Sequence, residues 1–486
     1  MDNYISMSLH LSTLNSKLYK MDRREFLKHM GSAAVATSVV LSACDSNGNE
    51  TPIAKNVIDG QGEMTYRTNP NSGDKVSLLG YGMMRLPVEE GGTLRDHPDS
   101  PIDQEMVNQE IDYALEHGIN YFDTSPAYCK GMSERATGIA LARHPRDTYY
   151  IATKLSNFSP STWSTEASKA MFENSLKELQ TDHIDYLLLH SIGGETKELN
   201  SHELFNARFI DNGILDWLVD QKAAGRIRNL GFSYHGDVNI FDMLLQWHDE
   251  GKYHWDFVQI ELNYLDWNYA DELNDRNTDA RYLYDELHRR GIPAVIMEPL
   301  LGGRLASLPD HIVKQMQERE PETPVARWAF RFAGTPEGIL TVLSGMTYME
   351  HLVQNVATYS PLRPISEEED AFLMKIAEEI VELPTVPCTA CNYCMPCPYG
   401  LNIPAIFSYY NKSVTDGSMP TGSHDAKAYW EARKRFLIGY DRTIPALRQA
   451  SHCIGCSQCK EHCPQNIDIP AELHRIDDYV EQLKQL

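Results

Sequence analysis

The feature that most constrains the fold is an eightfold alternation of short apolar segments with amphipathic helical patterns between residues 63 and 360. The apolar segments have the length of buried strands, and the stretches between them are long enough for helices. Eight strand–helix units in one segment predict an α/β fold, a (β/α)8 barrel. A doubly wound sheet is the alternative, but no G-x-G-x-x-G motif follows the first strand. The expected strands are 75–82, 119–125, 149–155, 184–190, 227–233, 257–263, 292–299 and 338–345.

Three of the expected helices are followed closely by a glycine, at Gly118, Gly225 and Gly291. Glycine is favoured just past a helix end, because the chain turns there through a left-handed conformation. These positions therefore predict where the chain leaves a helix and starts toward the next strand.

Ionisable residues stand at the ends of three consecutive expected strands. Asp123 ends the second strand, Lys154 the third and His190 the fourth, and Tyr128 follows Asp123 by five residues. In a barrel of this type the carboxyl ends of the strands carry the functional site. Each residue alone is compatible with an ordinary structural role, but together they predict a catalytic cluster.

Eight of the ten cysteines fall in two short runs near the C-terminus. The second run has the spacing C-x2-C-x2-C-x3-C-P, which is typical of a [4Fe–4S] site, and the first differs only in its last spacing. Structural zinc and disulfides are the alternatives, although zinc sites are usually built from pairs of C-x2-C. The predicted cluster ligands are Cys388, Cys391, Cys394, Cys397, Cys453, Cys456, Cys459 and Cys463.

The chain is strongly acidic, with a formal net charge of −24 from 68 acidic and 44 basic residues. Such a surface repels nucleic-acid phosphates, so we expect no nucleic-acid partner. The two cysteines outside the runs, Cys44 and Cys129, are too few for a disulfide framework.

The N-terminal segment has the composition of an export signal. Arg23 and Arg24 precede a stretch of small apolar residues that ends in Leu-Ser-Ala-Cys44. This stretch is too short to span a bilayer, and it resembles the signal of Tat-exported lipoproteins. We expect Met1 or Met21 as the start, residues 1–44 as the signal and 45–62 as a flexible tether. The resemblance implies an envelope protein on the periplasmic side, lipid-anchored at Cys44; a buried helix or an uncleaved anchor is the alternative.

The segments FDTSPAY, ATK and LLLH resemble the Asp–Tyr–Lys–His tetrad of aldo-keto reductases. The resemblance covers about residues 63–365 and implies an oxidoreductase that interconverts carbonyls and alcohols with a nicotinamide cofactor. It makes Tyr128 the general acid, with Lys154 lowering the pKa of the tyrosine. Asp123 would hold Lys154, and His190 would orient the substrate oxygen.

The same resemblance implies residues for the nicotinamide cofactor. Met297 stands where many relatives have a tyrosine, and no Arg or Lys precedes Asn355 after the last strand, where NADPH-preferring relatives place basic residues. NADPH, NADH and a bound flavin therefore stay open. The implied cofactor residues are Ser233, Gln259, Met297, Leu301, Gly302, Ser344, Gly345, Gln354 and Asn355.

Residues 366–486 resemble the ferredoxin module of an iron–sulfur branch of that family, here expected to be mainly helical. By the crossover rule for two-cluster ferredoxins, Cys463 would join the first three cysteines of the first run on one cluster. Cys397 would join Cys453, Cys456 and Cys459 on the other.

Taken together, the patterns and the resemblances predict an exported oxidoreductase for a small carbonyl or sugar-like substrate, coupled to or supported by two [4Fe–4S] clusters. A redox partner protein is one expected partner. Hydride transfer moves two electrons and a cluster moves one, so a flavin, a partner or a structural role for the clusters must resolve the mismatch. An electron-transfer or scaffold protein with a non-catalytic barrel is the alternative, and a glycan-modifying enzyme is a third.

Overall fold

The computed structural model describes residues 42–44, 50–52, 62–274, 276–424 and 426–486. The expected signal residues Arg23 and Arg24, and nearly all of the expected tether, lie outside the described residues. Strand β1 (Ser42–Cys44) pairs antiparallel with β2 (Glu50–Pro52). Every later element belongs to one compact unit, Ile58–Leu486. Within the described ranges, no helix has both the length and the apolar character needed to cross a membrane.

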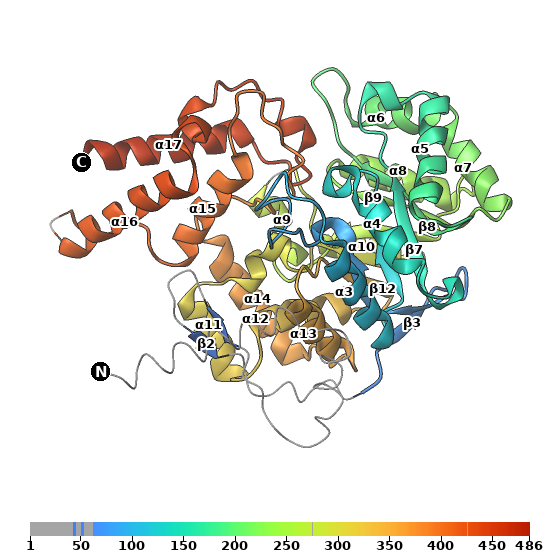
Figure 1. The fold of residues 1–486 in the computed structure, drawn as a ribbon, viewed down its shortest axis with the longest axis horizontal. Coiled ribbons are helices and arrows are strands. Elements are labelled where there is room, and N and C mark those ends of the chain that lie inside the picture. The colour runs from blue at the N-terminus through green and yellow to red at the C-terminus, as the bar shows by residue number, and fades with distance from the viewer. Residues whose placement is uncertain (1–41, 45–49, 53–61, 275, 425) are drawn as a thin grey trace. The chain divides into compact units, whose positions relative to one another are not determined.

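Eight parallel strands close into a barrel, which confirms the expected fold (Figure 1). Around the barrel each strand pairs with its neighbours in chain order, and the last strand pairs with the first. The strands are β5 (Leu79–Gly82), β6 (Tyr121–Asp123), β7 (Tyr150–Leu155), β8 (Ile184–Ile192), β9 (Ile227–Tyr234), β10 (Phe257–Glu261), β11 (Ala294–Met297) and β12 (Ile339–Ser344).

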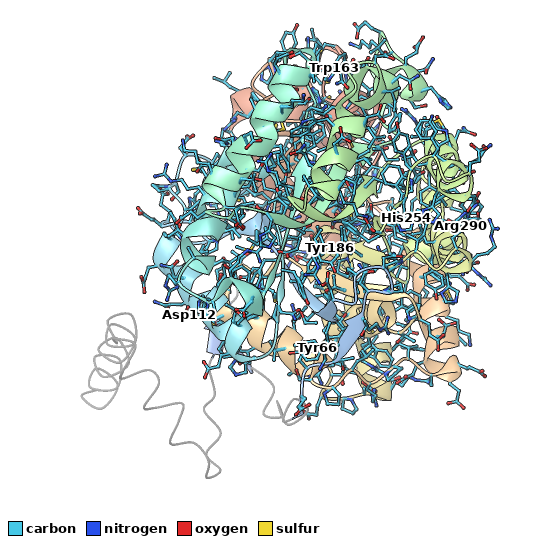
Figure 2. The ribbon with its side chains drawn as sticks, turned by 90° about the vertical axis from the view of Figure 1, so that its right-hand side faces the viewer. Tyr66, Asp112, Trp163, Tyr186, His254 and Arg290 are labelled. Carbon is cyan, nitrogen blue, oxygen red and sulfur yellow. The ribbon has the colours of Figure 1, made fainter. Side chains whose placement is uncertain are left out.

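The first expected strand, 75–82, is two strands in the structure. Only β5 enters the barrel, while β4 (Lys75–Ser77) forms an antiparallel hairpin with β3 (Tyr66–Thr68). The hairpin lies near the start of the barrel strands, where Tyr186 Oη donates to Asp74 Oδ2 (2.9 Å). Figure 2 labels Tyr186 and Tyr66. The change of direction between β4 and β5 leaves no mark in the apolar pattern, because both strands are buried on at least one side.

Helices follow the strands and cover the barrel. Gly118, Gly225 and Gly291 all have positive φ (88°, 78° and 67°), as expected where the chain leaves a helix. The helices of this layer are α3 (Gln104–Glu116), α4 (Ser133–Leu141), α5 (Thr165–Glu178), α6 (Ser201–Phe205), α7 (Ile214–Ala223), α8 (Val238–Asp249), α9 (Asp266–Leu273), α10 (Ala280–Arg289), α11 (Asp310–Arg319), α12 (Val325–Gly334) and α13 (Met349–Tyr359).

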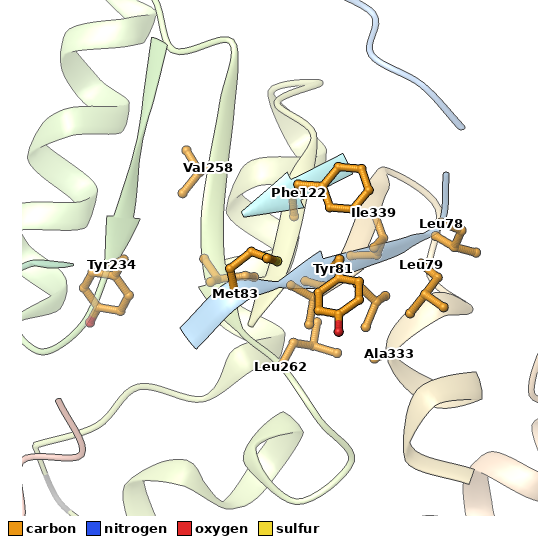
Figure 3. Close-up of a cluster of buried hydrophobic side chains, with 14 of the residues drawn as sticks. Leu78, Leu79, Tyr81, Met83, Phe122, Tyr234, Val258, Leu262, Ala333 and Ile339 are labelled. Carbon is orange, nitrogen blue, oxygen red and sulfur yellow. The ribbon is translucent and has the colours of Figure 1, made fainter. Parts of the chain in front are cut away.

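One large hydrophobic core joins the barrel strands to these helices. Figure 3 shows part of it around β5, where Leu79 and Tyr81 pack among side chains from other strands and from α12. Each fully buried side chain of this size contributes roughly 1.5–3 kcal/mol. Helix α14 (Glu367–Val381) also belongs to this core through Leu373 and Ile376, although the sequence placed it with the C-terminal segment.

The C-terminal segment has a hydrophobic core of its own. Three helices provide most of it: α15 (Ile403–Thr415), α16 (Lys427–Thr443) and α17 (Ile469–Gln485), in orange and red in Figure 1. The two cysteine runs are loops and short turns that flank α15 and α17. The expected mainly helical module is therefore confirmed.

Candidate active site

All four residues of the predicted catalytic cluster line one cavity of about 570 Å³. Asp123 is the last residue of β6, Lys154 lies near the end of β7, and His190 lies near the end of β8. Tyr128 begins a short 3-10 helix, Tyr128–Gly131, in the loop after β6. The strand ends thus bring the four side chains together as the barrel rule predicts.

Lys154 and Asp123 form a buried ion pair. Lys154 Nζ donates to Asp123 Oδ1 (2.6 Å) and to the carbonyl oxygen of Thr124 (2.9 Å), and both side chains are almost fully buried. Burial raises the pKa of Asp123 and Lys154 opposes the rise; burial lowers the pKa of Lys154 and Asp123 opposes the fall. A buried charge without its partner is costly, so each residue holds the other in place.

Tyr128 lies directly beside this pair, with Lys154 Nζ 4.7 Å from the centre of its ring. Burial raises the pKa of Tyr128 well above 10, and Tyr393 and Asp123 add to the rise. The expectation that Lys154 lowers this pKa stays a prediction, because burial is the largest influence on the pKa. The phenol is therefore held protonated, as a proton donor must be.

His190 completes the group, with its ring edge-on to the Tyr128 ring at 5.9 Å between centres. Its Nδ1 lies 2.6 Å from the hydroxyl oxygen of Ser156. Burial lowers the pKa of His190 well below 6.5, and Lys154 and Arg208 lower it further. The imidazole is thus neutral, and Nε2 is the nitrogen available to a substrate oxygen.

Eight of the nine predicted cofactor residues line the same cavity. Leu301 is the exception and corrects the expectation: it is 1% exposed and packs in the hydrophobic core. Among the eight, Ser233 Oγ accepts from the Ser191 amide (2.8 Å) and Asn355 Nδ2 donates to Ser344 Oγ (3.0 Å). The lining residues are Ser233, Gln259, Met297, Gly302, Ser344, Gly345, Gln354 and Asn355.

Gln259 gives the clearest match to a nicotinamide. Its Oε1 atom is buried and has no hydrogen-bond partner among the described residues. A buried acceptor without a partner costs about 1–3 kcal/mol unless something bonds to it. The amide N–H of a carboxamide would supply that partner, so the residues present fit the group.

The first cysteine run forms part of the cavity wall, which the sequence did not predict. Cys391 and Tyr393 line the cavity together with the tetrad. Arg85 Nη2 donates to the carbonyl oxygen of Thr389 (2.8 Å), and a Cβ atom on Gly302 would lie 2.4 Å from Thr389 Cα. The iron–sulfur module is therefore packed onto the mouth of the barrel.

The sequence analysis missed several cavity residues. Arg85 could have been predicted as one of them, because it lies three residues past the end of β5. Tyr393 could not, because nothing between Cys391 and Cys394 indicates where the loop packs. Glu298 could have been predicted in the same way as Arg85, since it directly follows β11. It is a buried cavity residue whose pKa is raised by burial, against the influence of Arg85.

The predicted ligands of the first cluster share one neighbourhood. Burial raises the pKa of the Cys394 thiol, and Cys391, Cys388 and Cys463 all add to the rise. Burial likewise raises the pKa of Cys463, where Cys391 and Cys388 again contribute. Cys463 thus lies near cysteines of the first run, although Cys459 also contributes to the shift of Cys394. The division of the eight cysteines between two clusters stays a prediction.

The other four thiols form a second neighbourhood. Burial raises the pKa of Cys459 to about 11, and Cys453, Cys456 and Cys397 add to it. No three Cys, His, Asp or Glu side chains in the described part of the chain converge on a single metal ion. A single ion such as zinc draws its thiolates to one point, whereas a four-iron cluster is larger and takes its cysteines around its periphery. Both sets fit a cluster by their ligand type and number.

A barrel whose strand ends hold a buried Asp–Lys pair, a protonated tyrosine and a neutral histidine defines an oxidoreductase-type active site. Residues 78–376 match the model of the aldo/keto reductase family, and residues 387–467 match a 4Fe-4S dicluster domain. The chain belongs to the aldo/keto reductase family and carries a 4Fe-4S domain in addition.

Curated relatives agree with this assignment. L-galactose dehydrogenase from Arabidopsis thaliana is 24% identical over 330 residues, which cover 63% of this chain and 92% of that protein. The aldo-keto reductase YhdN from Bacillus subtilis is 33% identical over 133 residues, 26% of this chain and 38% of that protein. D-arabinose 1-dehydrogenase from Saccharomyces cerevisiae is 33% identical over 114 residues, 22% of this chain and 33% of that protein.

Among solved structures, an aldo-keto reductase from Bacillus halodurans in its holo form is 24% identical. It aligns with 65% of this chain and 96% of its own, with a TM-score of 0.49. An aldo-keto reductase from Klebsiella pneumoniae in complex with NADPH is 20% identical, covers 65% and 95%, and has a TM-score of 0.48.

Proposed function

We propose that the chain interconverts a carbonyl and an alcohol on a small sugar-like substrate, with Tyr128 as the proton donor. The observation that carries the proposal is the single cavity that holds the buried Lys154–Asp123 pair, the protonated Tyr128 and the neutral His190. Two curated relatives named for sugars, L-galactose dehydrogenase and D-arabinose 1-dehydrogenase, support the substrate class.

In the direction of reduction, the carbonyl oxygen lies between Tyr128 Oη and His190 Nε2. Tyr128 donates its proton to this oxygen as negative charge develops there, and His190 donates a hydrogen bond that orients it. Lys154 stabilises the tyrosinate that remains, and Asp123 keeps Lys154 in place. A nicotinamide bound beside Gln259 would supply the hydride, so the carbonyl gains one hydride and one proton.

We further propose that the eight cysteines hold two [4Fe–4S] clusters, one in each thiol neighbourhood. The first cluster would lie against the wall of the catalytic cavity, because its ligand Cys391 lines that cavity. Its electrons would be exchanged one at a time with a redox partner protein. The N-terminal motif supports export and acylation at Cys44 as a separate proposal.

The test of the catalytic proposal is Tyr128→Phe in the cluster-loaded protein, with Tyr282→Phe as the matched control. Tyr282 is an exposed tyrosine on α10, outside the cavity. Loss of a positioned acid costs about 10²–10⁴-fold in turnover, so we expect that loss for Tyr128→Phe and none for the control. Carbonyl turnover at the wild-type level in Tyr128→Phe would sink the proposal and favour a scaffold role for the barrel.

The coupling of the clusters is tested by anaerobic titration with NADPH and then NADH, following cluster absorbance and nicotinamide fluorescence together. Bleaching of the clusters would show that the two sites exchange electrons. Binding without bleaching would assign the clusters a structural or separately served role.

Export is tested by replacing Arg23 and Arg24 with lysine and, separately, Cys44 with alanine. Retention of the double variant in the cytoplasm and loss of lipid labelling in Cys44→Ala are the expected results. Unchanged location and labelling would contradict the proposal.

A further inference from the structure

A second cavity of about 490 Å³ lies beside the catalytic cavity. Three residues line both cavities: His235, Tyr393 and Pro464. Arg208, which lines the second cavity, donates from Nη2 to the carbonyl oxygen of His190 (2.6 Å). The second cavity thus adjoins the catalytic cavity across these three residues, on the side of the tetrad where His190 lies.

The barrel and the iron–sulfur module each supply part of the wall. Phe158 and the loop after β8 form the barrel side, and residues 457–466 form much of the module side. Direct bonds hold the two sides together. Lys197 Nζ donates to the carbonyl oxygen of Cys456 (2.6 Å), and Asn466 Nδ2 donates to Asn277 Oδ1 (2.9 Å). A wall held in this way is a preformed binding surface.

Two of the charged groups in this cavity are held in ion pairs. Arg276 forms an ion pair with Glu195, and Lys460 forms one with Asp468 (3.1 Å). Arg208 is buried and donates to the uncharged oxygens of Asn157, Ser191 and His190. Lys197 donates to the carbonyl oxygen of Cys456. The lining therefore offers charged donors and, at Glu461, a carboxylate acceptor, and both can bond to the hydroxyl groups of a ligand.

The remaining chemistry combines aromatic faces with hydrogen-bonding groups. The rings of Phe158 and Tyr393 lie 6.3 Å apart between centres. Glu461 offers acceptors, and Asn466 and Ser457 offer both donors and acceptors. A sugar ring presents apolar C–H faces and a rim of hydroxyls that both donate and accept, so it matches this combination.

We propose that the second cavity binds the second sugar unit of a glycoside whose reacting carbon lies at Tyr128 and His190. The iron–sulfur module then selects the substrate as well as holding clusters. This inference builds on the proposed carbonyl–alcohol chemistry, and it extends the substrate class from a single sugar to a glycoside.

The test is calorimetric binding to the full, cluster-loaded chain without nicotinamide, so that turnover plays no part. The probes are lactose, cellobiose and maltose, each compared with D-glucose and D-galactose. We expect at least one disaccharide to bind tenfold or more tightly than either monosaccharide. Equal affinities for disaccharides and monosaccharides, or no binding of any probe, would overturn the inference.

Two variants test whether the second cavity causes the tighter binding of disaccharides. Phe158→Leu changes the barrel side of the cavity, and Glu461→Gln changes the module side. Each should reduce the disaccharide advantage, which is the ratio of disaccharide to monosaccharide affinity, at least threefold. Lys427→Ala on α16 is the control, since Lys427 is exposed and outside the cavity. Cluster absorbance of each variant checks that the module stays loaded. An advantage that survives both substitutions would place the second sugar elsewhere and refute the assignment.

The proposed function and the glycoside inference would be refuted by different results. A disaccharide advantage that depends on Phe158 and Glu461 would stand even if Tyr128→Phe kept full turnover. Turnover that depends on Tyr128 without any disaccharide advantage would leave the proposed function intact and remove only the glycoside subsite.

Discussion

At the scale of single residues, burial decides the protonation of this protein more often than neighbouring charge does. Tyr128, Asp123 and His190 all have their neutral forms favoured by burial. The same effect operates outside the active site at Glu110, a fully buried carboxyl on α3 that accepts a hydrogen bond from Tyr81 Oη (2.9 Å).

Glu110 predicts a pH dependence of stability. Burial raises the pKa of Glu110 from 4.5 to about 8, although the Tyr81 hydrogen bond opposes the rise. The folded protein therefore keeps a proton that the unfolded chain releases. The contribution of this group to stability is fully present below about pH 4.5 and is lost as the pH rises through about 8, at up to roughly 1.4 kcal/mol per pH unit.

Glu110→Gln should flatten this dependence, which denaturant unfolding at pH 5, 6, 7 and 8 would measure. Glu105→Gln on the same helix is the control, because Glu105 is exposed. Parallel pH profiles for wild type and Glu110→Gln would show that the carboxyl titrates normally.

The catalytic residues were predictable from sequence because a barrel places strand ends together whatever the loops do. Asp123, Lys154 and His190 each stand at a strand end that the apolar pattern locates. Tyr393 was not predictable, since its place depends on how two separately folded segments pack. Leu301 was misplaced because a turn that begins near the cavity sends its first side chain into the core.

At the scale of elements, the turn Leu301–Ala306 packs closely against the first cysteine run. Gly302 and Gly303 both have positive φ, at 66° and 95°. A Cβ atom on Gly302 would meet the backbone of Thr389, whereas one on Gly303 would meet nothing within 4 Å. A comparison of substitutions at the two glycines therefore separates the cost of backbone strain from the cost of the contact with Thr389.

Gly302→Ala should displace the first cysteine run, and Gly303→Ala should not. Both variants carry the left-handed strain of roughly 1–2 kcal/mol, so any further loss in Gly302→Ala reports the contact with Thr389. Iron content after anaerobic reconstitution and the free energy of unfolding are the measurements. Equal iron retention and stability in the two variants would mean that Thr389 moves aside easily.

The sequence pattern predicted strands and helices better than it predicted their boundaries with the module. The sequence placed helix α14 in the module of residues 366–486, since the helix lies between the last barrel strand and the first cysteine run. Its apolar face, including Leu373 and Ile376, nevertheless packs against the barrel. The periodicity of an amphipathic helix shows that one face is buried, but it does not show against which core that face packs.

At the scale of the whole molecule, two hydrophobic clusters in the barrel and one in the module lie in one compact unit. The barrel core is large and needs no metal, whereas the core of the module is surrounded by cysteine loops. We expect calorimetry of the cluster-loaded protein to show two transitions, and removal of iron by a chelator to lower only the one that belongs to the module. One transition that shifts as a whole would show that the cores unfold together.

The wall that Cys391 and Tyr393 contribute to the catalytic cavity would tie activity to the iron supply if the first cysteine run holds a cluster as proposed. Loading of that cluster would then fix the wall and complete the substrate site. Activity would then depend on the iron supply. On that proposal, protein made without iron would have a displaced first cysteine run and lower activity, and oxidative loss of the first cluster would have the same effect.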